Sequence, residues 1–154
     1  MITLRQGKAK AILDSSISSA LTAVETYNRP RAQFRIENYI LLMVLAWTKL
    51  FHAYFQTSIG ERYFYKEKNR RYKIVDGEKK AWELTECIRQ YQKSNPTSLL
   101  SEAVVANLKF FIGIRNKIEH RYWDSSSLDI FNIDVTYSSF SICSKFITGI
   151  PFAV

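Results

Sequence analysis

Residues 34–59 constrain the fold most, because they are apolar on almost every side of a helix. A helix that packs on one side shows a single apolar stripe, whereas this pattern is typical of a helix surrounded by others. The segment therefore predicts a central helix. Its longest uninterrupted apolar run, YILLMVLAW at 39–47, ends at Thr48 and is about half of what a membrane span needs. We therefore expect a soluble protein.

Helical spacing of apolar residues predicts three further helices around the central one. Their expected ranges are about 8–27, 82–92 and 98–122. The first is expected to end before Pro30, and a less regular pattern over 131–147 predicts a last helix. We expect one domain over residues 1–154: a mainly α bundle of four to five helices.

Between the second and third predicted helices, aromatic or β-branched residues alternate with charged ones. The turn signals EKN at 67–69 and DG at 76–77 predict a small β-hairpin insert at about 62–75. Residues 62–80 hold eight Lys or Arg against three acids, with aromatic rings among the cations. The insert fits a solvated charged ribbon or a contact with the RNA backbone equally well. Its candidate RNA-binding residues are Arg70, Arg71 and Lys73.

The whole chain carries 22 Lys and Arg against 14 Asp and Glu, a formal net charge of +8. This balance favours polyanions as partners, nucleic acid ahead of an anionic membrane surface. Cys87 and Cys143 lie far apart without CxxC spacing, and neither histidine is near them in sequence. We therefore expect no metal site, no cofactor and a reduced, cytoplasmic protein. The N-terminal residues show no signal-peptide pattern.

The stretch RNKIEH at 115–120 is the main candidate for chemistry. Five residues of helix advance the chain about 7.5 Å and turn it about 140°, so Arg115 and His120 flank a face rather than share a stripe. Asn116 precedes His120 by one turn and can hydrogen-bond the imidazole or a shared ligand. Lys117 and Arg121 add positive charge nearby and are further candidate RNA-binding residues, while Glu119 can pair with one of them.

An arginine and a histidine together suit metal-independent cleavage of RNA. That reaction removes a proton from the 2′-OH, gives one to the leaving 5′-oxygen and develops charge on the phosphorane. Histidine can transfer either proton near neutral pH, and the planar arginine fork suits phosphate. Because two transfers need two groups, we expect a two-fold dimer with facing motif helices. The alternative is an ordinary charged helix end, which the helix dipole favours.

Arg115 also interrupts an apolar helical series that includes Phe111 and Ile118. A buried guanidinium without a partner is costly, so this face is expected to meet either an acid or a second copy of the chain. In the dimer interpretation, Phe111 lies in the interface and both copies of the motif line one groove.

RNKIEH matches the R-x4-6-H motif of the HEPN superfamily (higher eukaryotes and prokaryotes nucleotide-binding domain), including the polar residue after the arginine. Other stretches, together with the charged insert, resemble one uncharacterised prokaryotic branch found in phage-defence contexts. They are AVETYNRP at 23–30, FRIENYILLMVLAWTKLFHAYF at 34–55 and NLKFFIGIRNKIEHRYW at 107–123. The resemblance covers about residues 8–125. Relatives of this branch continue further, so a substrate-binding or regulatory region is expected to be absent.

The resemblance implies a helical bundle that dimerises and acts as a metal-independent endoribonuclease, in the role of a toxin or phage-defence effector. It marks Arg115 and His120 as catalytic, with Asn116 as their polar companion. It implies RNA as substrate and a cognate antitoxin as a further partner. Two alternatives stay open: an inactive HEPN domain that binds nucleic acid or a partner protein, and a bundle used only for assembly. Glu37 resembles a recurring acidic position of the branch, or it pairs with Arg115 or Lys49.

The remaining histidine and the tryptophans have structural interpretations. His52 lies in an aromatic stretch and is expected to be a packed or surface histidine. The tryptophans are expected in the core or an interface rather than as base-stacking platforms; they are Trp47, Trp82 and Trp123.

Overall fold

The structure is a computed structural model that describes residues 2–3, 7–31, 33–95, 100–120 and 152–153. Within them, the helices are α1 (Lys8–Asn28), α2 (Arg35–Ser58), α3 (Leu84–Ser94) and α4 (Glu102–His120). The strands are β1 (Ile2–Thr3), β2 (Ile74–Val75), β3 (Glu78–Lys79) and β4 (Phe152–Ala153). The predicted mainly helical bundle, with a small antiparallel hairpin between its second and third helices, is confirmed.

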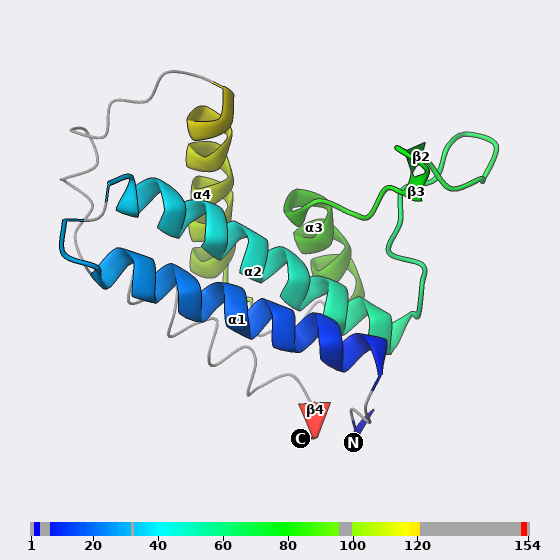
Figure 1. Cartoon of the computed structure of the whole chain (residues 1–154). Coiled ribbons are helices and arrows are strands. Elements are labelled where there is room, and N and C mark those ends of the chain that lie inside the picture. The colour runs from blue at the N-terminus through cyan, green and yellow to red at the C-terminus, as the bar shows by residue number, and fades with distance from the viewer. Residues whose placement is uncertain (1, 4–6, 32, 96–99, 121–151, 154) are drawn as a thin grey trace.

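α2 is the central helix, as its apolar sequence predicts. α1 runs antiparallel to it along one side, while α3 and α4 cross it on the other (Figure 1). Because α2 has neighbours on both sides, it buries a broad face, including Met43, Leu50, Phe51 and Phe55. Its remaining side is not covered in the same way, since Leu45 is 43% exposed. The Phe51 ring lies 5.6 Å from the Tyr91 ring of α3, edge-on, so aromatic packing joins α2 to α3.

Small side chains let α1 and α2 approach closely. Ser16, Ala20 and Ala23 of α1 are buried, as is Ala46 of α2. The buried Ser16 hydroxyl donates a 2.7 Å hydrogen bond to the Ala46 carbonyl, so the polar atom is satisfied inside the interface. Lys49 donates to two serine hydroxyls of α1, Ser15 at 2.8 Å and Ser19 at 3.1 Å.

α1 ends where the sequence predicts a break. Its C-cap is Arg29, whose extended backbone (φ −70°, ψ 117°) is the conformation that the ring of the following Pro30 imposes. α3 and α4 also lie within two to four residues of their predicted ranges. The parallel pairing of β1 with β4, Ile2 opposite Phe152, was not predicted. The predicted helix over 131–147 and Trp123 lie outside the described residues.

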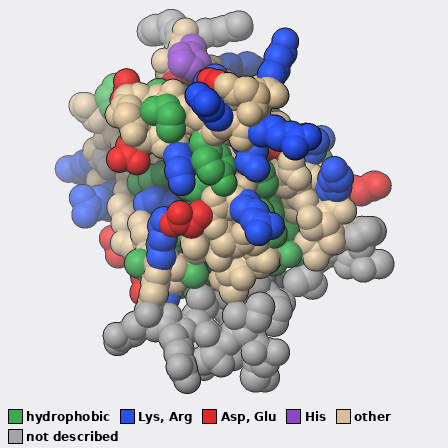
Figure 2. All heavy atoms as spheres, turned by 90° about the vertical axis from the view of Figure 1, so that its right-hand side faces the viewer, with side chains coloured by type: hydrophobic (Ala, Val, Ile, Leu, Met, Phe, Trp, Pro, Cys, Tyr) green, Lys and Arg blue, Asp and Glu red, His purple; other side chains and the backbone are tan. Residues whose placement is uncertain are grey.

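The hairpin forms around the predicted DG turn. Asp76 and Gly77 both have positive φ, 52° and 83°, as a two-residue type I′ turn requires. Bridges from Phe64 to Ala81 and from Lys66 to Tyr72 add a preceding segment, so the pairing extends beyond the predicted end at residue 75. The insert projects from the body of the molecule in Figure 1. Lys and Arg side chains spread across this side of the surface, around a strip of hydrophobic ones (Figure 2).

Candidate functional site

The apolar series of α4 packs against α2 within the same chain. Val104, Leu108, Phe111 and Ile114 are all buried. Phe111 is only 5% exposed, and its ring lies 6.4 Å from the ring of Tyr39 on α2. The expectation that Phe111 lies in an interface between two copies is therefore wrong, because α2 already covers this face.

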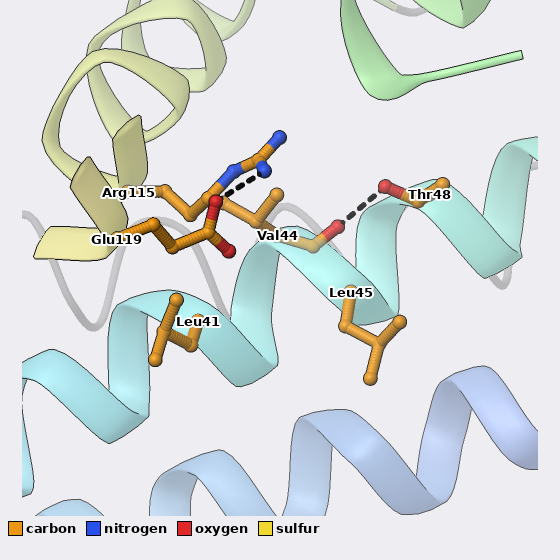
Figure 3. A pocket seen from close by; sticks show the side chains of 6 residues that line it. All are labelled: Leu41, Val44, Leu45, Thr48, Arg115 and Glu119. Atoms are coloured by element: carbon orange, nitrogen blue, oxygen red, sulfur yellow. Dashed lines mark hydrogen bonds and ion pairs between the residues drawn. The ribbon is translucent and has the colours of Figure 1, made fainter. Parts of the chain in front are cut away.

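Arg115 lies on the same inner side of α4, at the edge of the core. Its Nη1 atom donates to Glu119 Oε2 at 2.7 Å, one turn later on the helix (Figure 3). Of the two alternatives expected for Arg115, an acid or a second copy of the chain, the structure shows an acid, which is Glu119 rather than Glu37. The Arg115 Nε atom is buried and has no hydrogen-bond partner among the described residues. One N–H group of a charged side chain is thus left unsatisfied.

His120 and Asn116 occupy the opposite, exposed side of α4. The His120 side chain is 74% exposed, whereas that of Arg115 is 26% exposed. Asn116 is also exposed, one turn before His120. Glu119 connects the two sides, because its Oε2 atom lies 2.7 Å from Arg115 Nη1 and 3.9 Å from His120 Nε2. Arg115 and His120 therefore flank a face, as their spacing predicts.

An open groove of about 410 Å³ lies beside Arg115, between α2 and α4. Leu41, Val44 and Leu45 of α2 form its apolar floor, and Thr48 of the same helix adds a hydroxyl group (Figure 3). The Thr48 hydroxyl donates to the Val44 carbonyl at 2.7 Å, so its oxygen remains an acceptor. Arg115 and Glu119 complete the lining from α4. The sequence pattern did not identify this groove, because its floor and its charged wall come from separate helices.

The hairpin carries the other predicted cations on its surface. Arg70, Arg71 and Lys73 are exposed, and a 3.0 Å hydrogen bond from the Arg71 amide to the side chain of Asn69 shapes their turn. Other hairpin lysines lie over aromatic rings. Lys66 is 5.4 Å and Lys79 4.7 Å from the centroid of the Tyr72 ring. Cation–π contacts therefore hold Lys66 and Lys79 in place, while Arg70, Arg71 and Lys73 face solvent.

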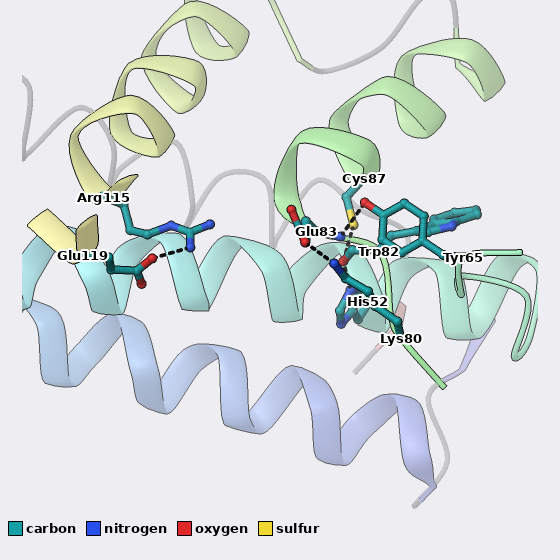
Figure 4. A network of polar contacts seen from close by, with 8 residues as sticks. All are labelled: His52, Tyr65, Lys80, Trp82, Glu83, Cys87, Arg115 and Glu119. Atoms are coloured by element: carbon teal, nitrogen blue, oxygen red, sulfur yellow. Dashed lines mark hydrogen bonds and ion pairs between the residues drawn. The ribbon is translucent and has the colours of Figure 1, made fainter. Parts of the chain in front are cut away.

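A polar and aromatic cluster fixes the base of the hairpin to the core. His52 Nε2 lies 2.8 Å from the Trp82 carbonyl, which also accepts from Cys87 Sγ at 3.5 Å (Figure 4). His52 also stacks on the ring of Tyr63 at 5.0 Å. Burial lowers the pKa of His52 and raises the pKa of the Cys87 thiol. His52 was expected to be a packed or a surface histidine, and the structure shows it packed. Burial disfavours the charged form of both groups.

The remaining predicted residues are placed as follows. Trp47 is 2% exposed in the core and Trp82 packs edge-on against Phe55, 5.3 Å between centroids. Lys117 is exposed on α4, and Arg121 lies outside the described residues. Over the described part of the chain, no three His, Cys, Asp or Glu side chains come together as metal ligands. In the same residues, no helix combines the length and apolarity needed to cross a membrane.

These features define a small helical domain with a basic insert and an Arg–Glu–His arrangement at the end of its last described helix. The chain belongs to a family described as a domain of unknown function, DUF3644, whose model matches residues 11–139. Neither the curated proteins nor the solved structures contain a match. The family description names neither an activity nor the HEPN superfamily, so both remain predictions.

Proposed function

We propose that this chain is a metal-independent endoribonuclease of the HEPN type, acting in the cytoplasm as a homodimeric toxin or phage-defence effector. RNKIEH supplies the chemistry, with Arg115 and His120 as catalytic residues and Asn116 as their polar companion. A cognate antitoxin is the partner that such a toxin would require.

The Nε atom of Arg115, which is buried without a hydrogen-bond partner among the described residues, is the observation that carries this proposal. An arginine on the inner side of a helix, with one buried N–H that has no described partner, destabilises the fold. An apolar residue at the same position would not. Such a cost is typical of a residue retained for its chemistry. The guanidinium has five donors and its contact with Glu119 uses one, so donors remain for a phosphate.

His120 supplies the proton transfer in this proposal. Its imidazole is exposed at the end of α4 and is therefore open to RNA. A neutral imidazole removes the proton of the 2′-OH, and the 2′-oxygen attacks the adjacent phosphorus. The bond to the 5′-oxygen then breaks as that oxygen gains a proton, and a 2′,3′-cyclic phosphate remains. Arg115 stabilises the charge of the phosphorane.

A dimer would supply the second histidine that the reaction needs. We propose the exposed side of α4 as the dimer interface. Gly113 lies in the middle of that side, where a Cβ atom would meet nothing within 4 Å. A helical glycine costs about 1 kcal/mol relative to alanine, and no neighbour within the described chain requires it. If the α4 helix of a second copy packed closely against this one, a glycine would be required at position 113. Phe110, which is 41% exposed, is an apolar side chain on this surface.

The non-catalytic alternative is a HEPN domain that binds nucleic acid or a partner protein. The ion pair between Arg115 and Glu119 favours it, since a carboxylate already occupies one donor of the proposed phosphate ligand. In that case the exposed cations of the hairpin, Arg70, Arg71 and Lys73, supply the contact with an RNA backbone. Lys117 and Arg121 would extend this contact beside the motif.

Incubation of the purified protein with total RNA, with and without EDTA, tests the proposal. We expect cleavage in both conditions and a loss on the order of 10²-fold or more for His120→Ala. Lys93→Ala is the matched control, because Lys93 is exposed on α3, outside the motif and the side of α4 proposed as the interface. Strict dependence on an added divalent ion, or full activity of His120→Ala, would refute the proposed mechanism. Binding of RNA without cleavage would favour the alternative.

A further inference from the structure

The groove between α2 and α4 has the composition of a small-ligand site. Its volume of about 410 Å³ lies within the usual range for ligand pockets. Its floor is apolar, from Leu41, Val44 and Leu45, and its two charged groups lie together on the α4 wall. A flat, largely apolar ligand with hydrogen-bonding groups along one edge matches this arrangement.

The charged wall is electrically balanced, which argues against a bare anion as the occupant of the floor. The Arg115 guanidinium and the Glu119 carboxylate are in direct contact at 2.7 Å. Any anion entering the floor would meet the carboxylate as well as the guanidinium. A neutral group with both donors and acceptors meets no such repulsion. Within RNA, that description fits a base.

The order of donors and acceptors selects among the bases. Arg115 presents N–H donors, and the adjacent carboxylate of Glu119 presents two acceptor oxygens. Guanine carries the complementary edge, with O6 as acceptor beside N1–H and the 2-amino group as donors. Adenine, cytosine and uracil each lack two neighbouring donors on that edge, so a carboxylate cannot accept from them in the same bidentate way.

We propose that this groove binds a guanine base of the RNA, with Arg115 donating to O6 and Glu119 accepting from N1–H and the 2-amino group. The base lies on the leucine and valine floor. This inference deepens the proposed ribonuclease function by naming the base beside the cleaved bond, but binding itself requires no cleavage. Arg115 keeps further N–H donors for the adjacent phosphate, so the two roles are compatible.

Calorimetric titration of the full chain with the four mononucleotides tests this inference. We expect GMP to bind roughly tenfold or more tightly than AMP, CMP and UMP. Inosine monophosphate, which lacks only the 2-amino group, should bind between GMP and AMP. Glu119→Gln should remove the preference, because an amide presents a donor where the carboxylate accepted. Glu102→Gln, at the exposed start of the same helix, should keep it.

Equal affinities for the four nucleotides, no binding of any of them, or an unchanged preference in Glu119→Gln would overturn the guanine site. These outcomes are separate from those of the cleavage assay. A His120→Ala protein that still prefers GMP supports the groove even if no cleavage is found. Cleavage without a preference for guanosine would support the ribonuclease proposal but contradict the guanine site in the groove.

Discussion

Replacing Arg115 with methionine should stabilise the folded chain while removing its proposed chemistry. The guanidinium has a buried Nε without a described partner, and leaving such a donor unsatisfied costs about 1–3 kcal/mol. Methionine has a similar helix propensity, keeps apolar contact with the floor of the groove and has no N–H to satisfy. The substitution therefore recovers most of this cost.

Two smaller losses oppose the gain. The ion pair with Glu119 at spacing i,i+4 is partly exposed and contributes about 0.3–0.5 kcal/mol. Glu119 would also be left without its cation near a helix C-terminus, which costs a further 0.3–1 kcal/mol or so. We expect a net stabilisation on the order of 1 kcal/mol, which in a domain of this size raises Tm by about 2–4 °C.

Urea unfolding followed by circular dichroism measures this change, with Lys93→Met, at an exposed position of α3, as the control. The control should shift the free energy of unfolding by less than about 0.5 kcal/mol. Destabilisation of Arg115→Met by 1 kcal/mol or more would show that the folded chain satisfies the guanidinium completely. Arg115 would then be a structural residue, and the observation that carries the proposed function would be lost.

Three further predictions concern the core, the pH dependence and the hairpin. Phe111→Ala should cost about 3–5 kcal/mol because Phe111 is buried against Tyr39, whereas Leu21→Ala, at a half-exposed position of α1, should cost about 1 kcal/mol or less by the same unfolding assay. Burial lowers the pKa of His52 below its ordinary value of 6.5, so the unfolded chain takes up a proton that the folded chain does not. Stability should therefore fall as the pH drops below 6.5, and His52→Gln should flatten this dependence relative to His120→Gln. Changing Arg70, Arg71 and Lys73 to Ala should weaken RNA binding and reduce its salt dependence more than the loss of the exposed Arg29, Arg31 and Lys93 does. Equal effects would make the hairpin a solvated ribbon.

Local features of the fold could be predicted from the sequence because neighbouring residues determine them. The apolar period located α1, α2 and α4, Pro30 marked the end of α1, and DG marked the type I′ turn. The pairing of β1 with β4 could not be predicted in this way. Their two-residue strands lie at opposite ends of the chain, and so short a pattern carries no signal of its partner.

The candidate site was also predicted only in part from the sequence. The spacing of Arg115 and His120 correctly predicts that they flank a face of α4. The pattern also identifies Phe111 as buried, but a buried face does not reveal whether α2 or a second copy covers it. Glu119 stands at the i,i+4 position that pairs with Arg115, although the sequence reasoning assigned it to Lys117 or Arg121. The i,i+4 spacing of Arg115 and Glu119 was therefore the sequence signal for their ion pair.

The chemistry of the cleaved ends tests the central claim most directly. EDTA-treated protein is incubated with one RNA oligonucleotide and with the same oligonucleotide carrying a single 2′-deoxy residue before the cleavage site, and the products are identified by mass. If Arg115 and His120 promote attack by the 2′-OH, the RNA should yield a 2′,3′-cyclic phosphate or 3′-phosphate, and the 2′-deoxy substitution should block that cut. Products with a 3′-hydroxyl, or cleavage that ignores the 2′-deoxy residue, would contradict the account.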